Sequence, residues 1–232
     1  MGGLFYASER VSVSELERLA AQCLEEAEEA SERKATQSAQ DRDDFGVGRT
    51  GVHALVELDA LGLCLPVCQA SPEAPDWYLS HDPLGRASVV GVPFMDDRCG
   101  AQSAQVIVYG HRLAGTDAMF TRLAPCWRQE EFDRLQGKCL KWTTTQGTEE
   151  LAPLCALKLH EDDREIQELG MRGPDELRDW LMGQCRRADA LATGWQGLAA
   201  TAERDIALVT CNASFSGAPW RTVVIFVGTR KS

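Results

Sequence analysis

The sequence lacks the features of several common functional classes. It contains no CxxC pair and no cluster of basic residues. It also has no apolar run of roughly 18 or more residues, the length that a membrane-spanning helix needs. The four histidines stand at none of the spacings typical of zinc ligands: they are residues 53, 81, 111 and 160. We therefore expect no spanning helix in this chain and no bound metal.

Basic charge is scarce, since 24 Lys and Arg stand against 35 Asp and Glu, for a formal net charge of −11. Nucleic-acid binding depends on grouped Lys and Arg, so we expect no nucleic-acid partner. Hydrophobic residues occupy 44% of the 232 positions, which suits one globular domain with additions. The opening residues, MGGLFYASER, are too short and too polar for a signal peptide. The protein is therefore expected to be cytosolic, or to be the remainder of a chain whose export or anchor segment has been removed.

Cysteine, in contrast, is abundant, with nine residues. An odd count leaves at least one thiol unpaired if the others form disulfides. Cys64 and Cys68 would lie roughly 13 Å apart on an extended strand. That distance is too long for a bridge unless the chain turns at Pro66. The cysteines alone do not assign a redox compartment.

The chain divides into an N-terminal helical segment with a linker, residues 1–50, and a β-rich domain, residues 51–232. In the first part, apolar residues recur near helical spacing after an N-cap at Ser12 or Ser14. The polar stretch TQSAQDRDDFGVGRTG then predicts the linker.

From His53 onward, short apolar runs separated by turn residues predict a β body, either a barrel or a sandwich. The runs before the last two strands are HALVELDALG, LCLPVCQ, DWYLS, ASVVGVPFMDD, AQVIVYGH, KCLKWTTT and LAPLCALKL. TDAMFTRLAPC and RQEEFDRLQ predict short helices, and HEDDREIQELGMRG predicts a solvated acidic loop.

A longer helix is predicted just before the last two strands, in PDELRDWLMGQCRRADAL. Pro174 suits the first turn of a helix, where its missing N–H costs nothing. Leu177, Leu181 and Cys185 recur at the spacing of one helical face. This helix therefore interrupts the β body.

The last two predicted strands carry the clearest chemical signal. DIALVTC (205–211) and TVVIFV (222–227) are short apolar runs joined by the loop residues NASFSGAPW. Antiparallel pairing would bring Cys211, at the end of one strand, beside Arg221, at the start of the next. A cation within reach of a thiol favours the thiolate, which is the nucleophilic form.

His111 stands at the end of another predicted strand, where Gly110 stops the apolar run VIVY. Together with Cys211 and Arg221 it supplies what acyl transfer needs. A thiolate attacks a carbonyl carbon, an imidazolium protonates the leaving amine, and a guanidinium holds the oxyanion.

These residues lie within a series of sequence motifs that resembles those of the class B sortases, bacterial transpeptidases of the cell surface. The resemblance covers roughly residues 55–227. Its phrases are PVCQASPEAPDWYLSHDPLGRAS (66–88), PFMDDR (93–98), YGH (109–111), MFTRL (119–123), LVTC (208–211) and an Arg ten residues after the cysteine. It implies a mainly β fold: a closed sortase-type barrel of about eight strands, with an N-terminal helix and an additional helix before the last two strands.

By this resemblance, Cys211 is the nucleophile, His111 is the general acid and base, and Arg221 anchors the substrate and the oxyanion. Tyr109 and Thr210 flank the site as substrate-binding residues. The family cleaves a C-terminal sorting signal of surface proteins and holds the acyl part as a thioester. It then transfers that part to an amine of a peptidoglycan precursor or of a pilin subunit. No metal and no organic cofactor is implied.

The resemblance also implies a location on the extracellular face of the bacterial cell membrane, through an N-terminal anchor that is absent from this chain. Four residues near the site depart from those common in class B: Cys99, Arg112, Val209 and Asn212. Because they adjoin the site, they concern the choice of substrate more than the chemistry. The eight cysteines other than the nucleophile are unusual for the family, and we expect them to be mostly reduced.

Other interpretations stay open at this point. A papain-like cysteine protease or a transglutaminase places its nucleophile before the histidine and on the first turn of a helix, whereas Cys211 follows His111 and ends a strand. A catalytically inactive sortase-like binding module needs no activated thiol, so thiol reactivity separates it from an enzyme. Asn212-Ala213-Ser214 matches a glycosylation acceptor, but motifs of three residues arise readily by chance.

Overall fold

The computed structural model describes residues 51–211 and 219–228, together with Ser14 and Arg18. The predicted N-terminal helix and linker therefore lie almost wholly outside the described residues, as does most of the loop between the last two strands. Within the described ranges, no helix is long and apolar enough to cross a membrane.

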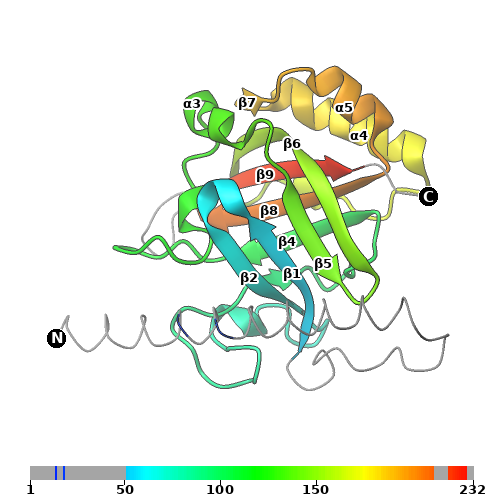
Figure 1. The fold of residues 1–232 in the computed structure, drawn as a ribbon. Helices are drawn as coiled ribbons and strands as arrows, with labels where there is room; N and C mark the ends of the chain where they lie inside the picture. Colours follow the sequence, from blue (N-terminus) through cyan, green and yellow to red (C-terminus); the bar gives the residue numbers. More distant parts are fainter. Residues whose placement is uncertain (1–13, 15–17, 19–50, 212–218, 229–232) are drawn as a thin grey trace, which may run out of the picture.

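The body of the protein is one sheet closed into a barrel (Figure 1). The strand order is β5-β1-β2-β3-β4-β8-β9-β6-β7, and β5 also pairs with β6, which closes eight strands into a ring and leaves β7 as an extra strand beside β6. The strands are β1 (Val52–Leu58), β2 (Leu63–Gln69), β3 (Phe94–Met95), β4 (Gln105–Gly110), β5 (Leu140–Thr144), β6 (Gly147–His160), β7 (Ala190–Leu191), β8 (Arg204–Cys211) and β9 (Trp220–Gly228). The predicted mainly β, closed barrel is confirmed.

Strands β8 and β9 are buried on both faces along most of their length. Alternate residues such as Leu208 and Val224 face the barrel interior, in the larger hydrophobic cluster. The residues between them, such as Val209 and Val223, belong to a second cluster on the outer face. Side chains on one face of these strands therefore point into the barrel, and those on the other face point to the outer cluster. The same alternation decides the direction of the residues at the strand ends.

Helices α4 and α5 cover the outer face of the barrel (Figure 1). The helical elements are α3 (Gln129–Phe132), α4 (Pro174–Arg187), α5 (Trp195–Thr201) and the 3-10 turns η1 (Asp59–Leu61), η2 (Trp77–Leu79), η3 (Thr121–Leu123), η4 (Asp133–Leu135) and η5 (Glu165–Gln167). The predicted helix before the last two strands is confirmed in α4, which begins at Pro174 and buries Leu177, Leu181 and Cys185. The sequence did not predict α5, because seven residues with Gly197 among them are too few to establish a helical period.

Residues 70–93 form a long connection, which corrects two of the predicted β runs. DWYLS forms the 3-10 turn η2, and ASVVGVPFMDD contributes only the two residues of β3. At Gly91, φ is +59° and a Cβ would lie 2.4 Å from the carbonyl oxygen of Tyr78. The connection therefore folds back on itself at a glycine, where a strand would have to stay extended.

Gly110, the last residue of β4, packs directly against the ring of Phe120, because a Cβ there would lie 2.4 Å from Phe120 Cδ2. We expect Gly110→Ala to lower the free energy of unfolding by about 1–3 kcal/mol, the usual cost of overpacking an interior. Urea unfolding measures this. The control is Gly183→Ala in α4, where a new methyl group meets no atom within 4 Å. The control should stabilise the protein by about 0.5–1 kcal/mol, and destabilisation in both variants alike would contradict the packing argument.

Asp205, near the start of β8, is only 1% exposed, and no described residue donates a hydrogen bond to its Oδ1. Burial raises the pKa of Asp205 well above its ordinary value, and the charge of Arg204 offsets part of this rise. A raised pKa means that the folded state binds the proton more tightly than the unfolded state does. The free energy of unfolding therefore falls as pH rises from the unfolded pKa, about 3.9, through the folded pKa, and it stays low above that.

We accordingly expect Asp205→Asn to be more stable than the unmodified protein at neutral pH. The gain has the direction of the shift, because the charged carboxylate of the parent is disfavoured by burial at neutral pH and the neutral amide is not. Urea unfolding between about pH 4 and pH 8 measures the variant and the parent together. If the parent gained stability with rising pH through the action of Asp205, the variant would be the less stable of the two at neutral pH, and the assignment would be wrong.

Candidate active site

Three predicted residues stand where neighbouring strands begin or end on one edge of the barrel. Strands β4 and β8 run parallel, with Gly110 beside Thr210. His111 and Cys211 each follow this last register pair by one residue. Strands β8 and β9 are antiparallel, with Cys211 directly opposite Arg221. The hairpin geometry predicted from the sequence is confirmed, and the strand order β4-β8-β9 adds His111 on the other side of the cysteine.

Cys211 and Arg221 project from the outer face of the sheet. Residues directly opposite on antiparallel strands point to the same face, and the preceding outward pair is Val209 with Val223. Cys211 is half-buried and carries a free thiol. A half-buried thiol is accessible to a substrate, and its pairing partner on the neighbouring strand is a cationic residue.

Thr210 faces the other way, into the barrel. It is 2% exposed, it pairs with the buried Thr222, and its hydroxyl has no hydrogen-bond partner among the residues that the structure describes. Its contact with a substrate stays a prediction. Because the side chain points inward, the backbone of Thr210 is the part closest to the site.

His111 is held at the edge by a hydrogen bond that fixes its proton. Its Nε2 lies 2.8 Å from the carbonyl oxygen of Leu79, and since a carbonyl can only accept, Nε2 carries the hydrogen. In the neutral ring Nδ1 is then the basic nitrogen. Among the described residues, His111 and Cys211 share no hydrogen bond, so proton exchange between them needs a small rotation of the ring or a bridging group.

Arg221 is held by a carboxylate in the connection between β6 and α4. This connection, residues 161–173, is called the outer loop below. Arg221 Nη2 donates to Glu161 Oε2 at 2.6 Å, and Nη1 lies 3.3 Å from the carbonyl oxygen of Trp220. The outer loop was predicted as a solvated acidic surface, so the sequence missed Glu161 as a partner of the candidate anchor. The only signal for it was the acidic run itself.

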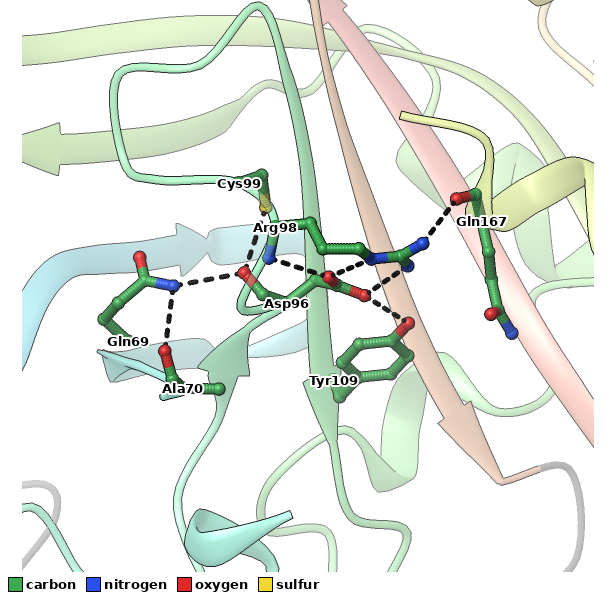
Figure 2. A network of polar contacts seen from close by, with 7 residues as sticks. All are labelled: Gln69, Ala70, Asp96, Arg98, Cys99, Tyr109 and Gln167. Atoms are coloured by element: carbon green, nitrogen blue, oxygen red, sulfur yellow. Dashed lines mark hydrogen bonds and ion pairs between the residues drawn. The ribbon is translucent and has the colours of Figure 1, made fainter. Parts of the chain in front are cut away.

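A polar network behind the site fixes Tyr109 and the outer loop together (Figure 2). Arg98 forms a fork with Asp96, with Nε and Nη2 each 2.8 Å from a carboxylate oxygen. Tyr109 donates its hydroxyl to the same carboxylate at 3.1 Å, and Arg98 Nη1 lies 3.3 Å from the carbonyl oxygen of Gln167 in the outer loop. One ion pair thus positions a side chain of β4 and a backbone group of the loop.

This network also sets the protonation states of its members. Burial alone would raise the pKa of Asp96, but the hydrogen bonds and the charge of Arg98 outweigh it and lower the pKa. Burial and the neighbouring Asp96 raise the pKa of Tyr109. Asp96 is therefore a carboxylate and Tyr109 a neutral phenol at physiological pH, which makes the network structural and Tyr109 unsuited to act as a base.

A cavity of about 340 Å³ opens on the outer face between the sheet and the outer loop. It is lined by Ile107, Tyr109, Leu159, His160, Glu161, Asp163, Ile166, Gln167, Val209, Arg221 and Val223. Its floor is apolar and its rim is polar, a combination typical of sites that bind small ligands or side chains. Because Arg221 belongs to its lining and pairs with Cys211 across the strands, the cavity adjoins the candidate nucleophile. In the described part of the chain, no three His, Cys, Asp or Glu side chains group as metal ligands would.

No family model and no curated protein matches the sequence. Solved structures of sortase B match the fold. The Staphylococcus aureus sortase B–substrate complex has a TM-score of 0.73 at 18% identity, covering 97% of this chain and 100% of that one. A mutant form of Clostridium perfringens sortase B has a TM-score of 0.72 at 16% identity, covering 92% and 96%. Sortase B complexed with Gly3 has a TM-score of 0.71 at 18% identity, covering 94% and 97%.

The match extends over nearly the whole of both chains, so it includes the barrel and the helices that cover it. A papain-like arrangement, with the nucleophile on the first turn of a helix, does not describe Cys211, which is the last residue of a strand. The closed eight-strand barrel with α4 before its last two strands was predicted from sequence motifs and is found in this chain, whose fold matches these structures. This chain has the fold of the class B sortases.

Proposed function

We propose that the protein is a cysteine transpeptidase of the sortase type. The observation that carries the proposal is the register of three neighbouring strands. Cys211 pairs with Arg221 across β8 and β9, and His111 directly follows β4, the neighbour of β8 on its other side. A thiol, an imidazole and a guanidinium so arranged are the groups that acyl transfer requires.

The reaction proceeds in two halves. In the first, the Cys211 thiolate attacks the carbonyl carbon of the scissile peptide bond, and Arg221 stabilises the oxyanion. The C–N bond then breaks, His111 protonates the leaving amine, and the acyl part stays on Cys211 as a thioester. In the second, an acceptor amine attacks the thioester and gives a proton to His111. A new amide forms and the thiolate of Cys211 is released.

The cavity beside Arg221 supports a peptide as the substrate, because its apolar floor and polar rim suit a side chain next to the scissile bond. Two of the similar structures are a sortase B–substrate complex and a sortase B complex with Gly3. For this chain, we infer that the donor is the C-terminal sorting signal of a surface protein. The acceptor is then an amine of a peptidoglycan precursor or of a pilin subunit. Tyr109 lines the substrate cavity, and Thr210 contributes through its backbone.

The same proposal assigns the remaining parts of the chain. Residues 51–232 form the catalytic domain, and residues 1–50 form a helical segment with a linker. The enzyme works on the extracellular face of a bacterial membrane. It needs neither a metal nor an organic cofactor, since the three side chains supply the nucleophile, the proton transfer and the oxyanion contact.

The test starts with brief exposure to a methanethiosulfonate, followed by intact mass and peptide mapping. We expect modification at Cys211 before the other cysteines, slowed by replacement of His111 or Arg221. A peptide library is then screened for a covalent acyl-enzyme by mass. A reactive Cys211 with no thioester for any peptide would favour a binding module with the same fold, and a Cys211 blocked in a disulfide would end the proposal.

A further inference from the structure

The candidate anchor Arg221 already has a carboxylate on its guanidinium. The distance from Arg221 Nη2 to Glu161 Oε2 is 2.6 Å. The Arg221 side chain is 28% exposed and the Glu161 side chain 46% exposed, so the pair lies at the surface of the cavity. An ion pair at such an exposed position is weak, so a substrate can displace it.

The topology decides on which side of Arg221 this carboxylate lies. Strand β9 is between β8 and β6, so Cys211 is on one side of Arg221 and the end of β6 is on the other (Figure 1). Leu159 of β6 is directly opposite Arg221, and the backbone N–H of Glu161 donates to the carbonyl oxygen of Pro219. Glu161 therefore lies on the β6 side of Arg221, and the ion pair brings Nη2 of the guanidinium to the outer loop.

Three other acids of the outer loop, Asp162, Asp163 and Glu165, have different partners. Asp162 Oδ2 lies 3.2 Å from His160 Nδ1. Asp163 and Glu165 both pair with Arg187 of α4. The contact with Arg221 is thus made by one identified carboxylate and is not a general property of an acidic loop, which gives a matched control next to it in the sequence.

We propose that Glu161 is a positioning residue that holds Arg221 in a resting orientation, and that an anion or a polarised carbonyl at Cys211 must displace it. The inference rests on the proposed function, because it concerns the anchor of that reaction. The incoming group competes with the Glu161 carboxylate for the same Nη2 donor. Glu161 therefore tunes how well the site accepts negative charge next to the nucleophile.

The experiment measures the labelling rate of Cys211 with two methanethiosulfonates, the anionic sulfonatoethyl reagent and the cationic trimethylammonioethyl reagent. Each forms a mixed disulfide with Cys211 and releases methanesulfinate, so no peptide substrate is needed. The proteins are the unmodified chain, Glu161→Gln and the control Asp162→Asn. We expect Glu161→Gln to raise the ratio of anionic to cationic rates by about two- to fivefold, and Asp162→Asn to change it less.

A double-mutant cycle with Arg221→Gln separates two effects of Glu161: its positioning of Arg221, and the electrostatic field of its own charge at Cys211. If Glu161 acts through Arg221, Glu161→Gln leaves the ratio unchanged once Arg221 is absent. Equal effects of Glu161→Gln and Asp162→Asn, or an effect that persists without Arg221, would overturn the inference and leave the proposed function standing. A Cys211 that labels no faster than the other cysteines in any of these proteins would overturn both.

Discussion

Cys211→Ala is expected to abolish peptide cleavage, with a loss of about 10⁴-fold or more, the scale seen when a catalytic nucleophile is removed. No thioester can form without the sulfur atom. Cys211 is half-buried at the end of β8, so the substitution leaves little cavity and should change the free energy of unfolding by about 1 kcal/mol or less. Steady-state cleavage, intact mass of the acyl-enzyme and urea unfolding measure the three effects.

The matched control is Cys139→Ala, which removes an exposed thiol directly before strand β5. We expect it to cleave peptides at the parent rate. If Cys211→Ala kept full turnover, or if Cys139→Ala lost it, the assignment of the nucleophile would be wrong.

Arg221→Lys is expected to lower kcat by about 10²–10³-fold, the usual effect of removing one donor to a developing oxyanion. Lysine keeps the charge but lacks the planar fork of the guanidinium. In this structure that fork reaches the carboxylate of Glu161 and the carbonyl oxygen of Trp220 at once. A single ammonium cannot keep both contacts while a further N–H turns to the oxyanion, so the oxyanion contact is expected to be lost even though the charge remains.

Arg134→Lys serves as the control, since Arg134 is 67% exposed and pairs locally with Glu131, three residues before it. It should be as active as the parent enzyme. Near-normal kcat in Arg221→Lys would show that Arg221 supports the end of β9 without contacting the reacting carbonyl.

The hairpin shows how far local sequence patterns reach. Its strands are breaker-free apolar runs and its loop is rich in turn residues, so the antiparallel pairing of Cys211 with Arg221 follows from neighbouring residues alone. His111 is different, because its place beside Cys211 depends on parallel pairing of β4 with β8, which are about a hundred residues apart in sequence. No periodicity specifies such a pairing, and only the resemblance to a family predicted it.

Several features of the site could not be predicted from the sequence, because they also depend on contacts between segments that are distant in the chain. Glu161 looked like one of many acids in a solvated loop, and only the path of the outer loop over the barrel brings it to Arg221. Asp96 and Arg98 are close in sequence, but their contacts with Tyr109 and Gln167 join segments that only the closed barrel places together. The connection of residues 70–93 was mistaken for strands, because short apolar runs satisfy a strand pattern whether or not a partner strand is available.

The sequence by itself determined the β character of the domain, the helix at α4, the final hairpin and the types of chemical group available. These depend on the periods of apolar residues, on turn and capping residues, and on side-chain chemistry, all of which act over a few positions. The tertiary structure alone decided that β5 pairs with β6 to close the barrel, and that β4 pairs with β8, which brings the strand ends before His111 and at Cys211 together. It also formed the cavity beside the outer loop and the ion pair between Glu161 and Arg221. Those depend on packing and pairing between distant segments, where many alternatives share the same local pattern and only the complete fold selects among them.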